Sequence, residues 1–365
     1  MATRLFIGTR KGLFTAECTD GTDWKVSEPE FLMREVPAIG LARRVDVGPA
    51  PPRLLVGFRS EHWGPTLVRS EDLGATWEET PQGSIVFPQE SGAALARIWQ
   101  LQGDPVRPGR VWAGCEPTSL WRSDDAGETF TLVKGLWDHP HRPHWAPGFG
   151  GAAVHTIVTD PDDDAHVIVA MSTGGVYVTH DAGQTWTPSN TGITAYFLPD
   201  PNPEYGQCVH KVAVDAVGTG TLYAQNHHGV YRSDDGGGTW TSIAGGLPSD
   251  FGFVMLAHPG TPGTAWVVPL EADARRVPPA GRLRMHRTRD GGQSWRELGG
   301  GLPEGSWTSV LRDAACVVDR GEEPPVLAFG TRDGAVYASS DEGDTMVEVA
   351  LHLPDVLCVR GVVLE

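Results

Sequence analysis

Hydrophobic residues occur along this chain in short runs of strand length, separated by polar, glycine-rich turns. Between residues 208 and 243, four such runs follow one another, at 208–215, 221–225, 229–233 and 239–243. Runs of about four to eight residues that are rich in β-branched and aromatic side chains and bounded by turn residues are typical of β-strands. The pattern therefore predicts a unit of four short strands.

One polar pattern, Ser/Thr-x-Asp-x-Gly-x-Thr/Ser-aromatic, recurs between the third and fourth strands of these units. Its central aspartates are separated by 53, 56, 54, 55 and 51 residues, and the sixth copy ends on a methionine instead of an aromatic residue. One period earlier, a degenerate copy surrounds Asp20. Seven periods therefore fill the chain, and the periodicity predicts one repeat architecture instead of two or three separate domains. The six aspartates are Asp72, Asp125, Asp181, Asp235, Asp290 and Asp341.

The residue types in this pattern suit a tight turn. An aspartate carboxylate can accept hydrogen bonds from backbone N–H groups of its own turn, and a glycine two residues later can adopt the positive φ that closes the turn. The aromatic side chain that follows can pack between neighbouring sheets. We therefore expect the pattern to form the turn between the third and fourth strands.

The repeated pattern resembles the Asp-box, or BNR repeat, of sialidases, xyloglucanases, sortilin-type receptors and photosystem assembly propellers. The resemblance covers the whole chain. It implies an all-β fold in which residues 1–365 form a single seven-bladed β-propeller of four-stranded blades. In those families the box stabilises a turn and does not touch substrate, so the resemblance implies a fold more directly than a function.

The two ends of the sequence complement each other. Residues 4–27 supply only three strands of the first blade, whereas residues 356–363 form a surplus strand after the seventh. We expect this C-terminal strand to complete the first blade and close the ring, which would remove the open sheet edges that promote aggregation.

Composition and charge narrow the range of partners. The chain contains 46 Gly and 29 Pro, which indicates many tight turns instead of long helices. Its formal net charge of −17 argues against nucleic-acid and anionic-membrane partners, because such a surface repels phosphates. No long apolar stretch or signal-peptide pattern is present, so we expect a soluble cytoplasmic protein. The five cysteines lack Cys-x-x-Cys spacing and are expected to be buried free thiols.

Long loops and most histidines map to the face opposite the repeated turns. The loops 135–151 and 190–207 are long and rich in aromatic residues, and long loops in compact domains are usually functional. Trp63, Trp145 and Tyr205 are candidate ligand-binding residues on this face, with packing of the loops as the alternative role. His166 and His180 fall on the other face and are expected at the surface.

Aligning the ends of the second strands of all blades identifies a ring of candidate site residues. Three arginines on neighbouring blades could bind the carboxylate or phosphate of a ligand bidentately, or form structural ion pairs with carboxylates such as Glu116 and Glu271. The same two glutamates are the candidate acid/base pair of a glycosidase. The aligned residues are Arg10, Arg59, Glu116, Thr173, His227, Glu271 and Arg332.

Three histidines form a candidate metal site. His155 and His210 occupy matching positions on the first strands of adjacent blades, and His227 ends the second strand of the latter blade. Neutral imidazoles suit a divalent metal such as zinc, iron or copper. The alternative is that His155 and His210 hydrogen-bond to water along the axis.

Three functions remain open at this point. The first is a glycosyl hydrolase or sialidase-like enzyme acting on a small-molecule or glycan ligand, with anionic ligands included because of the arginines. Sialidases have six blades and an early Phe/Tyr-Arg-Ile-Pro motif, and this sequence shows neither feature. The alternatives are a histidine-ligated, metal-dependent enzyme and a non-catalytic binding or assembly propeller.

Overall fold

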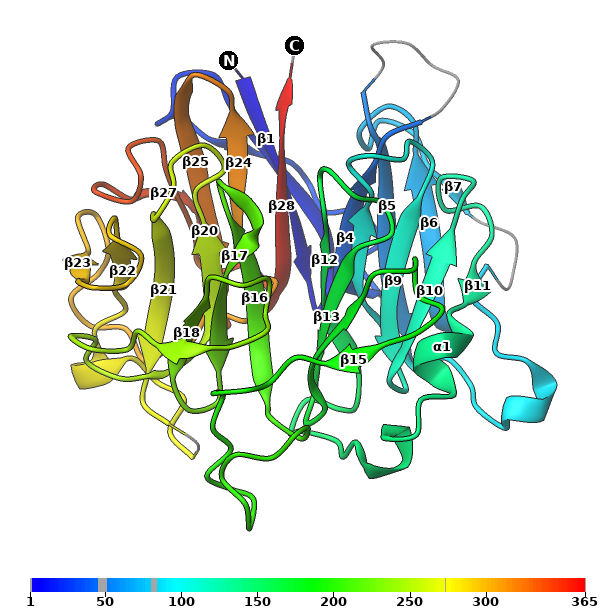
Figure 1. Ribbon diagram of the computed structural model, residues 1–365. Coiled ribbons are helices and arrows are strands. Elements are labelled where there is room, and N and C mark those ends of the chain that lie inside the picture. The colour runs from blue at the N-terminus through cyan, green and yellow to red at the C-terminus, as the bar shows by residue number, and fades with distance from the viewer. Residues whose placement is uncertain (1, 45–50, 80–83, 273, 365) are drawn as a thin grey trace. The chain divides into compact units, whose positions relative to one another are not determined.

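The hydrophobic runs form β-strands in the computed structural model, which describes residues 2–44, 51–79, 84–272 and 274–364. These strands make seven four-stranded sheets (Figure 1). Within the described residues, helix is limited to α1 (Lys134–Trp137) and the 3-10 turns Gln89–Ser91, Arg142–His144 and Pro279–Gly281. The fold class is all-β, a seven-bladed β-propeller with one antiparallel sheet per blade, as the sequence predicted.

The chain divides into two compact units. Unit 1 comprises residues 1–33, 191–202 and 210–365, and unit 2 comprises residues 34–190 and 203–209. The expectation of a single domain over residues 1–365 stays a prediction.

Four sheets belong to unit 1. Their strands are β1 (Ala2–Thr9), β2 (Gly12–Cys18), β3 (Lys25–Val26) and β28 (Val356–Leu364); β16 (Val209–Asp215), β17 (Gly218–Asn226), β18 (Val230–Ser233) and β19 (Thr241–Ser242); β20 (Phe251–Ala257), β21 (Ala265–Leu270), β22 (Met285–Thr288) and β23 (Arg296–Leu298); and β24 (Ala315–Arg320), β25 (Glu323–Gly330), β26 (Val336–Ser339) and β27 (Val347–Ala350).

Three sheets belong to unit 2. Their strands are β4 (Glu35–Ala42), β5 (Arg53–Ser60), β6 (Gly64–Ser70) and β7 (Glu78–Glu79); β8 (Arg97–Gly103), β9 (Val111–Glu116), β10 (Ser119–Ser123) and β11 (Thr131–Leu132); and β12 (Val154–Thr159), β13 (Val167–Met171), β14 (Gly175–Thr179) and β15 (Thr187–Pro188).

The C-terminal strand completes the first sheet. β28 pairs antiparallel with β1, from Ala2 opposite Leu364 to Thr9 opposite Val356, so the two ends of the chain lie side by side (Figure 1). Val356 and Val359 are fully buried. The surplus strand therefore occupies the position that the sequence predicted for it.

The repeated aspartates form the turns expected of them. In the turn before β15, Asp181 accepts hydrogen bonds from the Thr179 hydroxyl (2.7 Å), the Thr185 backbone N–H (2.9 Å) and the Thr185 hydroxyl (2.6 Å). Gly183 adopts φ 93°. Its N–H donates to the Thr179 hydroxyl at 3.0 Å. The sequence did not predict that the residue before the glycine would also have positive φ, as Ala182 does at 56°.

The aromatic residue after the turn packs against the preceding blade. Trp186, from the turn before β15, lies in one buried cluster with Trp112 and Leu120 of the β8–β11 sheet. In unit 1, the indole N–H of Trp295 donates to the carbonyl of Ile243 in the preceding blade at 2.8 Å. The predicted packing of these aromatic residues between sheets is therefore confirmed in both units.

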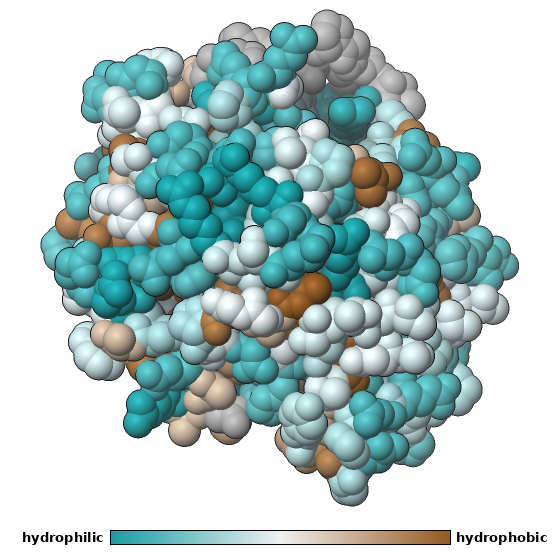
Figure 2. All heavy atoms as spheres, turned by 60° about the vertical axis from the view of Figure 1, so that its left-hand side comes forward, coloured by the Kyte–Doolittle hydropathy of each residue, from teal (hydrophilic) through white to brown (hydrophobic). Residues whose placement is uncertain are grey.

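The helices of the described residues are short, and Figure 2 shows one face of the molecule. No helix of the described residues is long and apolar enough to cross a membrane. On the face shown in Figure 2, hydrophilic residues predominate and the hydrophobic ones form small separate spots. Extended apolar patches mark interaction surfaces, and this face does not present one.

Removal of the C-terminal strand should destabilise unit 1. Loss of Val356 and Val359 alone withdraws two fully buried side chains, worth about 1.5–3 kcal/mol each. We expect deletion of residues 356–365 to lower the free energy of unfolding by at least about 3 kcal/mol in urea denaturation. Deletion of residues 364–365 is the control and should change little. A 356–365 deletion that unfolds like the intact chain would contradict the closure.

The repeated turns should make stability fall at low pH. Hydrogen bonds, chiefly from the hydroxyl at the end of each turn, lower the pKa of Asp72, Asp181 and Asp290 from 3.8 to about 2. Because the folded pKa lies below the unfolded value, this stabilisation is complete above about pH 4 and is lost as the pH falls through about 2. We expect the urea midpoint of the variant Asp72→Asn/Asp181→Asn/Asp290→Asn to fall less between these pH values than that of the unchanged protein. Parallel profiles for the two proteins would refute the assignment.

Candidate functional site

The residues aligned in the sequence stand at the ends of the second strands. Arg10, His227 and Glu271 directly follow β1, β17 and β21, and Glu116 is the last residue of β9. Arg59 lies in β5, one residue before its end, and Arg332 comes two residues after β25. Thr173 likewise comes two residues after β13, so the aligned residues lie between one residue before the end of the second strand and two residues after it.

Two of the three arginines meet on one carboxylate in unit 1. Arg10 Nε lies 2.9 Å and Arg332 Nη2 lies 2.9 Å from the same oxygen of Asp355. In unit 2, Arg59 donates to Glu35 at 3.5 Å. All three arginine side chains are about half exposed. These contacts are the ion pairs named as the alternative to ligand binding, and the binding of an anion by the arginines stays a prediction.

The two candidate catalytic glutamates have different surroundings. Glu116, in unit 2, accepts a hydrogen bond from the indole N–H of Trp99 at 3.0 Å. The loop at Gly151 comes so close that a Cβ there would lie 2.5 Å from Glu116 Oε1. Glu271, in unit 1, forms an ion pair with Arg275 at 2.6 Å. Their roles as an acid/base pair stay predictions.

Trp63 lines a pocket in unit 2. The pocket has a volume of about 410 Å³, and the Trp63 side chain in the turn between β5 and β6 is 73% exposed. Its polar lining includes Ser60 and Thr66, together with the ion pair between Arg34 and Glu79 at 2.9 Å. An exposed indole beside hydroxyls and a charged pair is a surface that can stack against a sugar ring and hydrogen-bond its hydroxyls.

A second exposed indole lies in unit 1. Trp307 is also 73% exposed and lines a smaller pocket of about 230 Å³ with Tyr337 and His352. The sequence gives no signal for Trp307, because it stands in its loop without neighbouring aromatic or histidine residues. It gives an internal comparison for Trp63.

The long loop 135–151 is held by the hydroxyl of Tyr177. Trp145 Nε1 donates to this oxygen at 3.1 Å, and His141 Nδ1 lies 3.0 Å from it. The ring of Tyr205 stacks on His141 with centroids 4.0 Å apart, and its hydroxyl lies 2.9 Å from His144 Nδ1. Trp145 is buried, so it packs the loop, whereas Tyr205 is only partly buried.

His155 and His166 lie in unit 2 and make different contacts. His155 is fully buried and lies with its ring centroid 6.4 Å from that of Trp99. The expectation that His166 lies at the surface is wrong, because it is buried and its Nδ1 lies 2.8 Å from an Asp160 oxygen. His180 is exposed as expected and stacks on His166.

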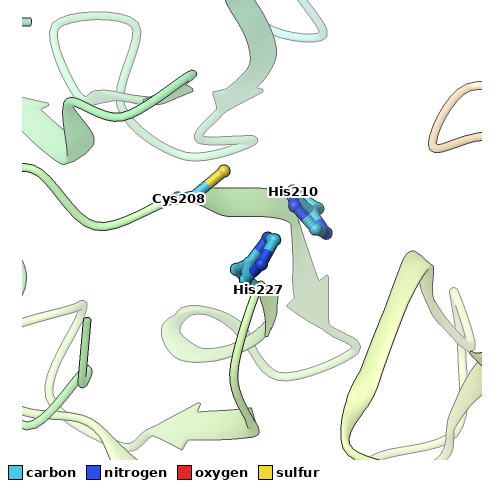
Figure 3. A group of neighbouring side chains, drawn as sticks. All are labelled: Cys208, His210 and His227. Atoms are coloured by element: carbon cyan, nitrogen blue, oxygen red, sulfur yellow. The ribbon is translucent and has the colours of Figure 1, made fainter. Parts of the chain in front are cut away.

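His210 and His227 come together in unit 1, with their ring centroids 5.5 Å apart. Cys208 precedes His210 by two residues, so the distance between these two is set by one continuous stretch of chain. One ligand atom from each of the three residues lies within 4.8 Å of the others (Figure 3). The lack of Cys-x-x-Cys spacing gave no signal for Cys208 as a ligand, although it directly precedes β16, and extended backbone places the side chains of a Cys-x-His pair on one face. Cys208 is half-buried, whereas the other four cysteines are buried as expected.

Comparison with known proteins identifies xyloglucanases as relatives by sequence. A probable oligoxyloglucan-reducing end-specific xyloglucanase of Neosartorya fischeri is 26% identical over 71% of this chain and 34% of its own length. A xyloglucanase of Hypocrea jecorina is 26% identical over 67% of this chain and 30% of its own length. This chain thus spans about a third of these relatives. No family model matches the chain.

Solved structures support the fold. The GH74 enzyme of Niastella koreensis superposes with a TM-score of 0.54 at 15% identity, over 96% of this chain and 67% of that one. YCF48 bound to D1 peptide superposes with a TM-score of 0.52 at 15% identity, over 87% of this chain and 82% of that one. At these identities the likeness establishes the propeller fold alone.

The hydroxyl of Tyr177 should be necessary for the order of loop 135–151. In Tyr177→Phe, the buried N–H of Trp145 loses its acceptor, which should cost about 1–3 kcal/mol of unfolding free energy. We expect a lower urea midpoint and faster proteolysis within the loop. Tyr196→Phe, at a ring that is 68% exposed, is the control and should behave like the unchanged protein. Equal stability of the two variants would exclude the anchoring role.

Proposed function

We propose that this chain is a glycan-binding propeller with glycosyl hydrolase activity, and that its ligand is a neutral glycan of the xyloglucan type. The observation that carries the proposal is the likeness to xyloglucanases over about two thirds of the chain. The pocket beside Trp63 supplies a surface suited to such a ligand. Since the chain spans about a third of those relatives, its activity is a proposal in its own right.

The pocket chemistry favours a neutral sugar. Among the described residues that line the pocket, the one cation, Arg34, forms an ion pair with Glu79 at 2.9 Å. The pair therefore offers hydrogen-bond donors and acceptors with little net charge. The indole of Trp63 is available for stacking on the apolar face of a pyranose ring. In addition, Arg10, Arg59 and Arg332 already contact carboxylates of this chain. These contacts support a neutral glycan over the anionic sugar of a sialidase-like enzyme.

Hydrolysis would use Glu116 and Glu271. Glycosidases typically need two carboxyl groups, one to protonate the leaving oxygen and the other to act as a base or nucleophile. Glu116 accepts a hydrogen bond from Trp99 and lies beside the backbone of Gly151, so its carboxylate has a fixed position. Glu271 is likewise oriented by Arg275. Glu116 is the last residue of β9, and Glu271 directly follows β21.

Replacing Trp63 should weaken glycan binding selectively. We expect Trp63→Ala to reduce the affinity for xyloglucan oligosaccharides by roughly tenfold, or about 1.4 kcal/mol, measured by isothermal titration calorimetry. Trp307→Ala is the matched control, because its indole is equally exposed, at 73%, in the other unit. Equal effects of the two substitutions, or no binding by the unchanged protein, would refute the pocket assignment.

The release of reducing ends from xyloglucan tests the proposed glycosyl hydrolase activity. Glu116→Gln and Glu271→Gln should each abolish release while leaving oligosaccharide binding within about twofold, because the amide keeps the size of the side chain but cannot transfer a proton as required. Binding without any release by the unchanged protein would leave the non-catalytic binding propeller as the function.

A further inference from the structure

We propose that Cys208, His210 and His227 bind a zinc ion, with the fourth coordination position open. Each offers one ligand atom, and these atoms lie within 4.8 Å of one another (Figure 3). In a tetrahedral site with Zn–S of about 2.3 Å and Zn–N of about 2.0–2.1 Å, ligand atoms are roughly 3.3–3.7 Å apart. Side-chain rotations that draw the atoms together by about 1 Å would therefore complete the site.

His210 is prepared to be a metal ligand. Its Nδ1 lies 2.6 Å from the carbonyl oxygen of Gly252, and since a carbonyl can only accept, Nδ1 carries the proton and Nε2 keeps its lone pair. A backbone carbonyl that fixes the tautomer is a usual outer partner of a metal-bound histidine.

The surroundings of His227 keep its ring in place and limit the access of water. Its ring makes edge contacts with Phe251 at 5.1 Å and Phe197 at 5.7 Å between centroids. Phe251 is fully buried and also contacts His210 at 5.6 Å. The apolar rings would therefore shield the proposed zinc site from water on this side.

The charge near the site favours an anionic fourth ligand. The guanidiniums of Arg276 and Arg312 lie 5.7 and 5.8 Å from the ring centroid of Phe253, which is itself 4.7 Å from that of His210. These cations oppose a bare divalent ion, and they favour an anion such as hydroxide or a carboxylate as the fourth ligand. The ligand set of one thiolate and two imidazoles also suits copper.

Metal titration of the full-length protein tests the site without any glycan. After dialysis against a chelator, the protein should bind one equivalent of zinc, measured by competition with a chromophoric chelator. Cys208→Ser and His227→Ala should each weaken zinc binding by more than about tenfold. Loss of an outer hydrogen-bond partner of a metal ligand already costs at least about tenfold in affinity, and loss of a direct ligand should cost more. Cobalt substitution should give a thiolate-to-metal absorption band that Cys208→Ser removes.

The controls use neighbouring residues of the same type. His228→Ala changes the half-buried histidine next to His227, and Cys18→Ser keeps a donor for the bond to Asp20; both should bind zinc like the unchanged protein. Tighter stoichiometric binding of copper through the same residues would support the site and replace zinc as its ion. Absence of stoichiometric metal, or equal affinity in all variants with unchanged circular dichroism, would overturn the proposal. Trp63→Ala should bind zinc normally, so failure of the glycan proposal would not imply failure of this one.

Discussion

The hydrogen bonds that converge on each repeated aspartate hold the outermost strand of a blade to the rest of its sheet. These outer strands are short: β7, β11, β15 and β19 contain two residues each. Ladders of two residue pairs, such as Tyr177–Pro188 and Val178–Thr187, are too short to fix a strand alone. The turn fixes one end of the strand through the carboxylate, and the aromatic residue that follows anchors the strand against the preceding blade.

This arrangement separates stability from function along each blade. The end of the sheet that carries the aspartate turn is constrained by local hydrogen bonds, so its sequence cannot vary freely. The opposite end carries the loops after the second and fourth strands, including the Trp63 turn and loop 135–151. The candidate glycan-binding and metal-binding residues lie at this end, because loop side chains can change while the strands beneath them stay the same.

The charges of the candidate site are largely balanced within the chain. Arg10 and Arg332 share Asp355, and deeper in unit 1 the buried carboxylate of Asp313 lies 2.6 Å from Lys211 Nζ and 3.1 Å from Arg360 Nη2. Such pairing offsets the cost of removing charges from water. The exposed indole of Trp63 and the group of Cys208, His210 and His227 carry the proposed glycan and metal sites.

The sequence by itself determined the blades, the turns and the C-terminal strand, because each rests on local periodicity or on hydrogen bonds between residues at most four apart. It also placed Arg10, Glu116, His227 and Glu271 at strand ends, since strand boundaries follow the same pattern. Only the tertiary structure decided their partners. Arg10 meets Asp355 across 345 positions of sequence, and Cys208 lies beside His210 and His227. Such neighbours depend on how blades and loops pack, and no short-range pattern encodes that packing.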